Sequence, residues 1–264
     1  MIILAIIAGV ILVLHRGRAA KAVWGGASLG AIVGLSVALT TGDWGLLALY
    51  FALGTFAGTL FKWTGRYRGF GLNPILVLII LNLLLFIATV IVPDIRPSLW
   101  LQPAGFLNRP WVILTSMFTH GSFWHIFTNM LTLFFFGSYL SRLVGQDRFL
   151  FVYFTGGILG NICYIVLTLI GAISAIGFLG SPFTPAVGAS GAIFALAGAL
   201  VMIRPRLTVF IFPIPVPIPL WIAVIGGFLI LSFLPHIAWQ AHLGGLVLGL
   251  VAGYFFRGKE RYSF

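Results

Sequence analysis

Apolar runs of about 20 residues recur along the whole length of this 264-residue chain. A helix needs about 20 apolar residues to cross the hydrocarbon core of a bilayer, and every backbone polar group must be satisfied inside that core. Only 7% of the residues are charged, against about 25% in soluble domains. The repeated runs therefore predict an all-α polytopic membrane protein.

The apolar runs give nine candidate membrane helices. They cover about residues 1–14, 22–41, 44–61, 74–92, 122–142, 148–171, 187–203, 218–235 and 239–257. The first is short, but it has neither the basic start nor the small-residue cleavage site of a signal peptide, so we interpret it as a helix. We expect two parts: N-terminal transmembrane helices of unknown role in 1–73, and a six-helix core in 74–264.

The net charge of +11 raises the question of nucleic-acid binding, which the distribution of the charges argues against. The basic residues stand in short clusters between apolar runs, as they do in cytoplasmic loops of membrane proteins. If the C-terminus is cytoplasmic, 13 of the 15 basic residues fall inside, and only Arg96 and Arg109 fall outside. We therefore expect a multi-pass protein of the plasma membrane whose C-terminus is cytoplasmic.

Two connections between the helices are unusual. Residues 93–121 form a long outside loop with four prolines and two tryptophans, which predicts a partly embedded interfacial segment. Pro213–Pro219 has proline at every second position. It cannot be helical, so we expect an extended connector.

Two stripes of small residues predict close helix packing. Gly245, Gly249 and Gly253 recur every four residues on the last helix, and the helix of Ser190 has a similar stripe. Such stripes let two helix backbones approach closely. If these two helices meet, Ser190 lies near His242.

Four polar side chains fall in one predicted layer of the membrane. His125, Asn129, Ser190 and His242 all lie within the first two turns of helices that start on the outer side, about 5–10 Å below the surface at 1.5 Å per residue. Interhelical hydrogen bonding for stability would account for any one of them. Four together favour a functional site, because polar groups at this depth usually face a bundle interior or a water-filled cavity.

These residue types suit nucleophilic catalysis. A serine hydroxyl needs a neighbouring base, which His242 can supply to Ser190. Preorganised donors must stabilise the developing oxyanion; candidates are the Ser190 backbone N–H, the Asn129 amide and the His125 ring. Gly188 leaves room for a substrate backbone. All four acidic residues lie at helix ends or in loops, so a Ser–His dyad is expected and an intramembrane aspartyl protease is excluded. No HExxH motif occurs, and zinc held by three histidines stays a minor alternative.

The motifs together resemble those of the rhomboid family of intramembrane serine proteases. They are Pro110-Trp111, His120-x4-His125-x3-Asn129, Gly188-Ala-Ser190-Gly191 and Ala241-His242-Leu-Gly-Gly245, within residues 74–257. The resemblance implies a helical fold with a cavity open to the outside, and cleavage of transmembrane protein substrates in the lipid bilayer without metal, nucleotide or other cofactor. It gives Ser190 the role of nucleophile, His242 that of base, and His125 and Asn129 that of oxyanion residues. His120 would order the long loop.

Three positions depart from the family pattern, and two other functions stay open. Val112 stands where many rhomboids have Arg, Ser141 where many have Glu, and Phe194 where Tyr is frequent. None of these removes the dyad. A catalytically silent rhomboid-like protein that binds transmembrane clients is one alternative, although such proteins typically lack the serine or the histidine. A small-solute transporter is another, but it would need a polar path across the whole membrane.

Overall fold

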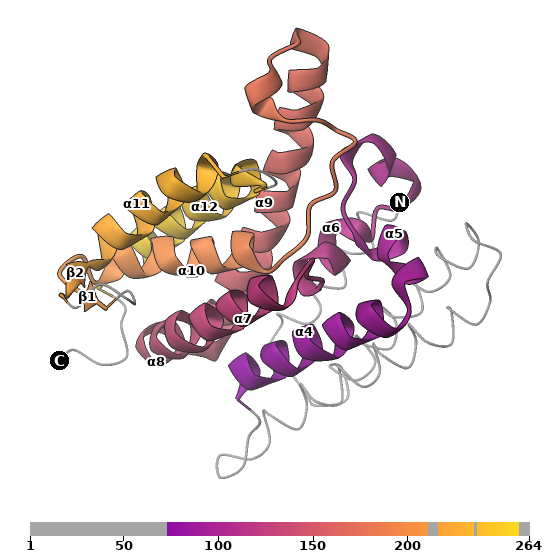
Figure 1. The fold of residues 1–264 in the computed structure, drawn as a ribbon. Helices are drawn as coiled ribbons and strands as arrows, with labels where there is room; N and C mark the ends of the chain where they lie inside the picture. The colour runs from indigo at the N-terminus through magenta and orange to yellow at the C-terminus, as the bar shows by residue number, and fades with distance from the viewer. Residues whose placement is uncertain (1–72, 211–215, 235–236, 259–264) are drawn as a thin grey trace, which may run out of the picture. The chain divides into compact units, whose positions relative to one another are not determined.

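The computed structural model of the protein describes residues 73–210, 216–234 and 237–258. The helices predicted over 1–14, 22–41 and 44–61 lie outside these residues, and so does most of the predicted 1–73 part. The described residues are mostly helical (Figure 1) and belong, from Ile75 on, to one compact unit. The prediction of a mostly helical membrane protein is confirmed.

In the described part of the chain, three helices are long and apolar enough to cross a membrane. They are α4 (Pro74–Ile91), α9 (Gln146–Ser174) and α12 (Trp239–Phe256). Two further apolar helices are shorter, α10 (Ser190–Ile203) and α11 (Leu220–Ser232). The segment predicted as one helix over 122–142 is formed by three consecutive helical pieces: α7 (Phe123–Thr132), the π-helical turn η4 (Leu133–Gly137) and α8 (Ser138–Val144).

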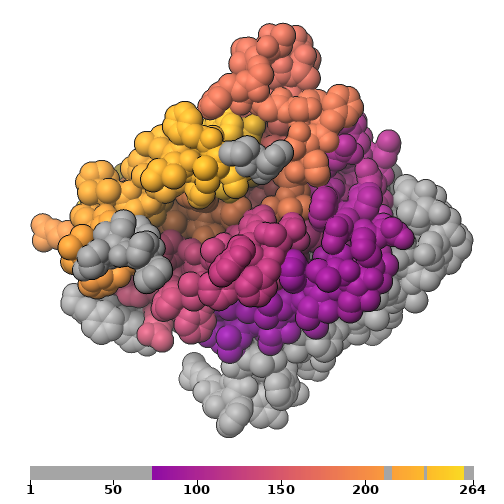
Figure 2. All heavy atoms as spheres, in the orientation of Figure 1, coloured from indigo at the N-terminus to yellow at the C-terminus, as the bar shows by residue number. Residues whose placement is uncertain are grey.

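The segment between α4 and α7 consists of short helical turns. These are η1 (Pro93–Ile95), α5 (Arg96–Leu99), η2 (Pro103–Asn108), α6 (Val112–Thr115) and η3 (Ser116–Phe118). The segment lies against the chain that leads from α9 to α10 (Figure 2). Two backbone hydrogen bonds of 3.1 and 2.8 Å between Leu101 and Ala186 hold the two together. Within it, the Trp111 indole N–H donates to the Ser98 carbonyl over 2.8 Å. Val112 is buried, at 1% exposure.

Two connections complete the described chain. The α9–α10 connection contains the short turn η5 (Gly177–Leu179). Between α10 and α11, β1 (Thr208–Val209) pairs antiparallel with β2 (Ile218–Pro219). The last two residues of the predicted Pro213–Pro219 connector are therefore extended, as expected; residues 211–215 lie outside the described part.

Helices α10 and α12 approach so closely that their backbones touch. A Cβ atom added to Gly245 would lie 1.9 Å from the Gly191 carbonyl oxygen, and one added to Gly249 would lie 2.0 Å from that of Ala195. A Cβ on Gly253 would lie 2.7 Å from the Ala199 oxygen. The glycine stripe thus acts as predicted, since any larger residue would force the two helices apart.

Replacing Gly249 with alanine is expected to destabilise the protein by about 1–3 kcal/mol or more, because the new methyl group meets backbone atoms that cannot rotate away. Gly226→Ala on α11 is the matched control, since a Cβ there meets nothing within 4 Å. The thermal unfolding midpoints of both variants in detergent measure the difference. Equal midpoints would show that the α10–α12 contact is looser than the structure has it.

Candidate active site

Ser190 is the first residue of α10 and follows a tight bend at Gly188. Gly188 has a φ of +119°, a region that residues with a Cβ rarely adopt. Its backbone N–H donates to the Ser116 carbonyl over 2.9 Å. A Cβ on Gly188 would lie only 2.7 Å from His125 Nε2. The bend therefore brings the chain against His125 immediately before it presents Ser190.

His242, near the start of α12, contacts Ser190 directly. Its Nε2 lies 2.8 Å from Ser190 Oγ, although the two residues are 52 positions apart. For the hydroxyl to donate to Nε2, the proton of the neutral imidazole must be on Nδ1. The Nδ1 atom is buried and has no hydrogen-bond partner among the described residues. The Phe194 ring stacks on the imidazole with centroids 4.7 Å apart and planes at 27°, so packing sets the orientation of the ring.

His125 and Asn129 share one face of α7. The Ser122 hydroxyl caps this helix by accepting from the His125 backbone N–H over 3.2 Å. The Asn129 side-chain amide donates to the His125 carbonyl over 2.7 Å. One amide hydrogen of Asn129 is thus used within its own helix, while the His125 ring faces the Gly188 bend.

His120 is buried beside His125, with only 3% of its surface exposed. The two rings make an edge contact with centroids 5.0 Å apart. Neither ring nitrogen of His120 has a hydrogen-bond partner in the described part of the chain. Burial, with a smaller contribution from nearby His125, lowers the pKa of His120 to about 3, so the ring is neutral near pH 7. His120 therefore supports the site through packing, and the structure gives it no hydrogen bond to the long loop.

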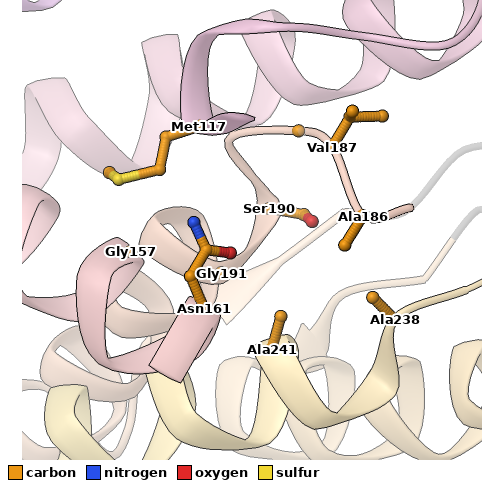
Figure 3. Close-up of a pocket in the computed structure, with 10 residues that line it drawn as sticks. Met117, Gly157, Asn161, Ala186, Val187, Ser190, Gly191, Ala238 and Ala241 are labelled. Carbon is orange, nitrogen blue, oxygen red and sulfur yellow. The ribbon is translucent and has the colours of Figure 1, made fainter. Parts of the chain in front are cut away.

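A small cavity opens beside Ser190 (Figure 3). It has room for about one water molecule, about 10 Å³. Asn161 of α9 lines it, and its amide donates to the Ile113 carbonyl over 2.7 Å and to the Ser116 hydroxyl over 3.0 Å. Since Ser116 also accepts from Gly188, Asn161 supports the bend before Ser190. Asn161 was not among the predicted site residues, and a single amide inside an apolar run was the available signal.

The start of α12 is bonded to the α9–α10 connection, a contact that was not predicted from the sequence. The Gln240 side chain donates to the Leu179 carbonyl over 2.8 Å, and the Trp239 ring stacks on Phe178 with centroids 4.9 Å apart. These contacts fix the helix turn that carries His242. No signal in the sequence identified this pairing.

Neither acidic residue of the described part is hydrogen-bonded to His242. Asp94 is in η1 and Asp147 lies in the first turn of α9. Among residues 73–210, 216–234 and 237–258, no three histidine, cysteine or acidic side chains come close enough to hold a metal ion.

A sequence model of the rhomboid domain matches residues 107–259. The chain belongs to the rhomboid family. The resemblance that the motifs predicted is confirmed, and with it the multi-pass membrane character. The matched region contains every residue of the candidate site, from His120 to His242.

Curated rhomboids of several organisms are similar to this chain. Rhomboid protein 1, mitochondrial, of Saccharomyces cerevisiae is 27% identical over 180 residues, which are 60% of this chain and 47% of that protein. RHOMBOID-like protein 12, mitochondrial, of Arabidopsis thaliana is 34% identical over 169 residues, 60% of this chain and 49% of that protein. Rhomboid protease GluP of Bacillus subtilis is 36% identical over 93 residues, 35% of this chain and 16% of that protein. The rhomboid chain described here thus spans less than half the length of these relatives.

Proposed function

We propose that this rhomboid is an intramembrane serine endopeptidase that cleaves transmembrane segments of membrane proteins. The observation that carries the proposal is the 2.8 Å contact between Ser190 Oγ and His242 Nε2. A hydroxyl within hydrogen-bond reach of a neutral imidazole is the arrangement that nucleophilic catalysis needs. One relative carries the name rhomboid protease, which agrees with this activity.

The first chemical step joins Ser190 to the substrate. Ser190 Oγ attacks the carbonyl carbon of the scissile peptide, and His242 Nε2 takes the hydroxyl proton. The tetrahedral intermediate then expels the amine, which leaves with the proton from His242. Water enters next, gives a proton to His242 and hydrolyses the acyl-enzyme, and Ser190 regains its hydrogen.

The oxyanion of the intermediate would be stabilised at the start of α10. The first N–H groups of a helix have no carbonyl partner one turn back, and the helix dipole favours negative charge there. The Ser190 N–H is the first of these donors. The His125 ring and the second amide hydrogen of Asn129 are the side-chain candidates. Position 188 needs a glycine because the His125 ring lies too close to leave room for a Cβ atom there.

We further propose that residues 74–264 form a six-helix catalytic core, preceded by N-terminal membrane helices in 1–73. The distribution of basic residues supports a cytoplasmic C-terminus and a site that opens to the extracytoplasmic side. We also propose a location in the plasma membrane, although two of the relatives are named as mitochondrial. Cysteine accessibility from each side of intact cells tests the orientation.

A fluorophosphonate probe tests the nucleophile without a known substrate. The full chain in detergent should become covalently labelled, and mass spectrometry should locate the label on Ser190. Ser190→Ala should abolish labelling, whereas Ser98→Ala, at a serine whose backbone carbonyl accepts from Trp111, should leave it unchanged.

Failure of a folded wild-type protein to label would contradict the proposal, provided that it also fails to cleave transmembrane segments in liposomes. The alternative function, a silent rhomboid that binds transmembrane clients, predicts that outcome. Under this alternative, clients would co-purify uncut with the wild type and with Ser190→Ala to the same extent.

A further inference from the structure

A second and larger cavity lies between the α4–α7 segment and the chain just before α10, two parts that lie against each other on the molecular surface (Figure 2). Its volume is about 370 Å³. Two arginines, Arg96 and Arg109, line it together with Trp100, Gln102 and three prolines. None of these residues belongs to the candidate active site, so the proposed protease leaves this cavity without a role.

The cavity lies at the depth of lipid headgroups. Helix α4 has 18 residues and ends at Ile91, and at 1.5 Å per residue it is about as long as the hydrocarbon core is thick. The lining begins two residues later, at Pro93. Leu107 in the same segment is 79% exposed, and Phe183 on the opposite side is 70% exposed. The Gln102 amide donates to the Phe183 carbonyl over 2.9 Å, so this apolar side chain is attached to the rim of the cavity.

The two arginines present unused hydrogen-bond donors. The Arg96 Nε–H donates to the Thr89 carbonyl over 3.0 Å, and one terminal N–H of Arg109 donates to the Pro97 carbonyl. A guanidinium has five N–H groups, so most of them remain free for a ligand. Among the described residues no carboxylate pairs with either arginine. Asp94, the one acidic residue between α4 and α7, is exposed and does not line the cavity.

The aromatic wall of the cavity adds to its preference for a polar, anionic ligand. The Arg96 guanidinium lies over the Trp100 ring, 5.8 Å from its centroid, which holds this cation at the cavity.

We propose that this cavity binds the phosphate group of an anionic phospholipid from the surrounding leaflet, held by Arg96 and Arg109. Guanidinium groups match phosphate with paired, charge-assisted hydrogen bonds. The apolar rim and the position at the end of α4 select a lipid headgroup over a free phosphate ion, since the acyl chains can follow the exposed side chains into the bilayer. Bound lipid would brace the segment in which Leu101 bonds to Ala186, next to the bend that presents Ser190.

Lipid titration of the full chain in a neutral detergent tests this site. Phosphatidylglycerol and phosphatidylcholine with the same acyl chains are added separately, and bound lipid is counted by native mass spectrometry. Phosphatidylglycerol is expected to bind at least about tenfold more tightly, and the double variant Arg96→Gln/Arg109→Gln is expected to lose that preference. The double variant Arg142→Gln/Arg257→Gln removes the same charge at two exposed residues, one on α8 and one directly after α12, and should keep the preference.

A photoreactive phosphatidylglycerol locates the site on the unaltered protein, so the test does not depend on how the variants fold. Its crosslinks should fall on residues 93–109 and near Pro185. Equal binding of the two lipids, a preference that survives in Arg96→Gln/Arg109→Gln, or crosslinks confined to other segments would overturn the proposal. Competition with inorganic phosphate distinguishes a lipid headgroup from a free anion as the ligand. Displacement of the lipid by millimolar phosphate would show that the cavity binds soluble anions instead.

Discussion

Replacing His242 with alanine is expected to slow the reaction of Ser190 by about 10⁴-fold, the largest effect of any single change outside the nucleophile itself. His242 Nε2 is the group that lies 2.8 Å from the serine hydroxyl, and no carboxylate contacts the imidazole in the described residues. Without the imidazole the hydroxyl keeps its proton and stays a weak nucleophile. The rate of fluorophosphonate labelling at Ser190 measures the loss without a known substrate.

A loss of activity in His242→Ala could also arise from packing, because the Phe194 ring stacks on the imidazole. Added imidazole separates the two causes. If His242 acts as the base, free imidazole should restore part of the labelling rate in His242→Ala and none in Ser190→Ala. Labelling of the unrescued variant within tenfold of the wild type would rule out His242 as the base.

Most of the described apolar helices could be predicted from the sequence because each depends on local properties of the chain. Length and hydrophobicity determine a membrane helix, and the predicted boundaries of the last described helix, 239–257, differ by one residue from α12. The partnership of Ser190 and His242 followed from the small-residue stripes, since only glycine lets the two helix backbones touch. The sequence pattern thus predicted both the helices and one contact between them, that of Ser190 with His242.

The remainder of the site depends on contacts between segments that the sequence does not connect. The short turns between α4 and α7 have no periodicity of their own; they exist because side chains such as Trp111 bond to carbonyls in the same segment. Asn161 lies 45 positions from Ser116, and their hydrogen bond appears only once α9 stands beside the loop. The same holds for Gln240 and Leu179, which are 61 positions apart. Neither the composition nor the spacing of residues predicts such hydrogen bonds.

Replacing Gly188 with alanine is expected to lower the labelling and cleavage rates by about 10²-fold, the loss typical of a damaged oxyanion site. Two independent costs act at this position. The φ of +119° strains any residue with a side chain by about 1–3 kcal/mol. The new methyl group would also lie 2.7 Å from His125 Nε2 and 2.9 Å from Cε1, so either the ring or the bend must move. Either movement would displace the hydrogen-bond donors that surround Ser190.

Gly121→Ala is the matched control for this effect. It adds the same methyl group to a nearby exposed glycine, where a Cβ would meet nothing within 4 Å and φ is not in the left-handed region. It should leave both rates within about twofold of the wild type, and thermal unfolding of both variants should show that Gly188→Ala remains folded. A Gly188→Ala protein that reacts as fast as Gly121→Ala would mean that His125 and the bend can separate freely, and His125 could then not serve as a preorganised donor to the oxyanion.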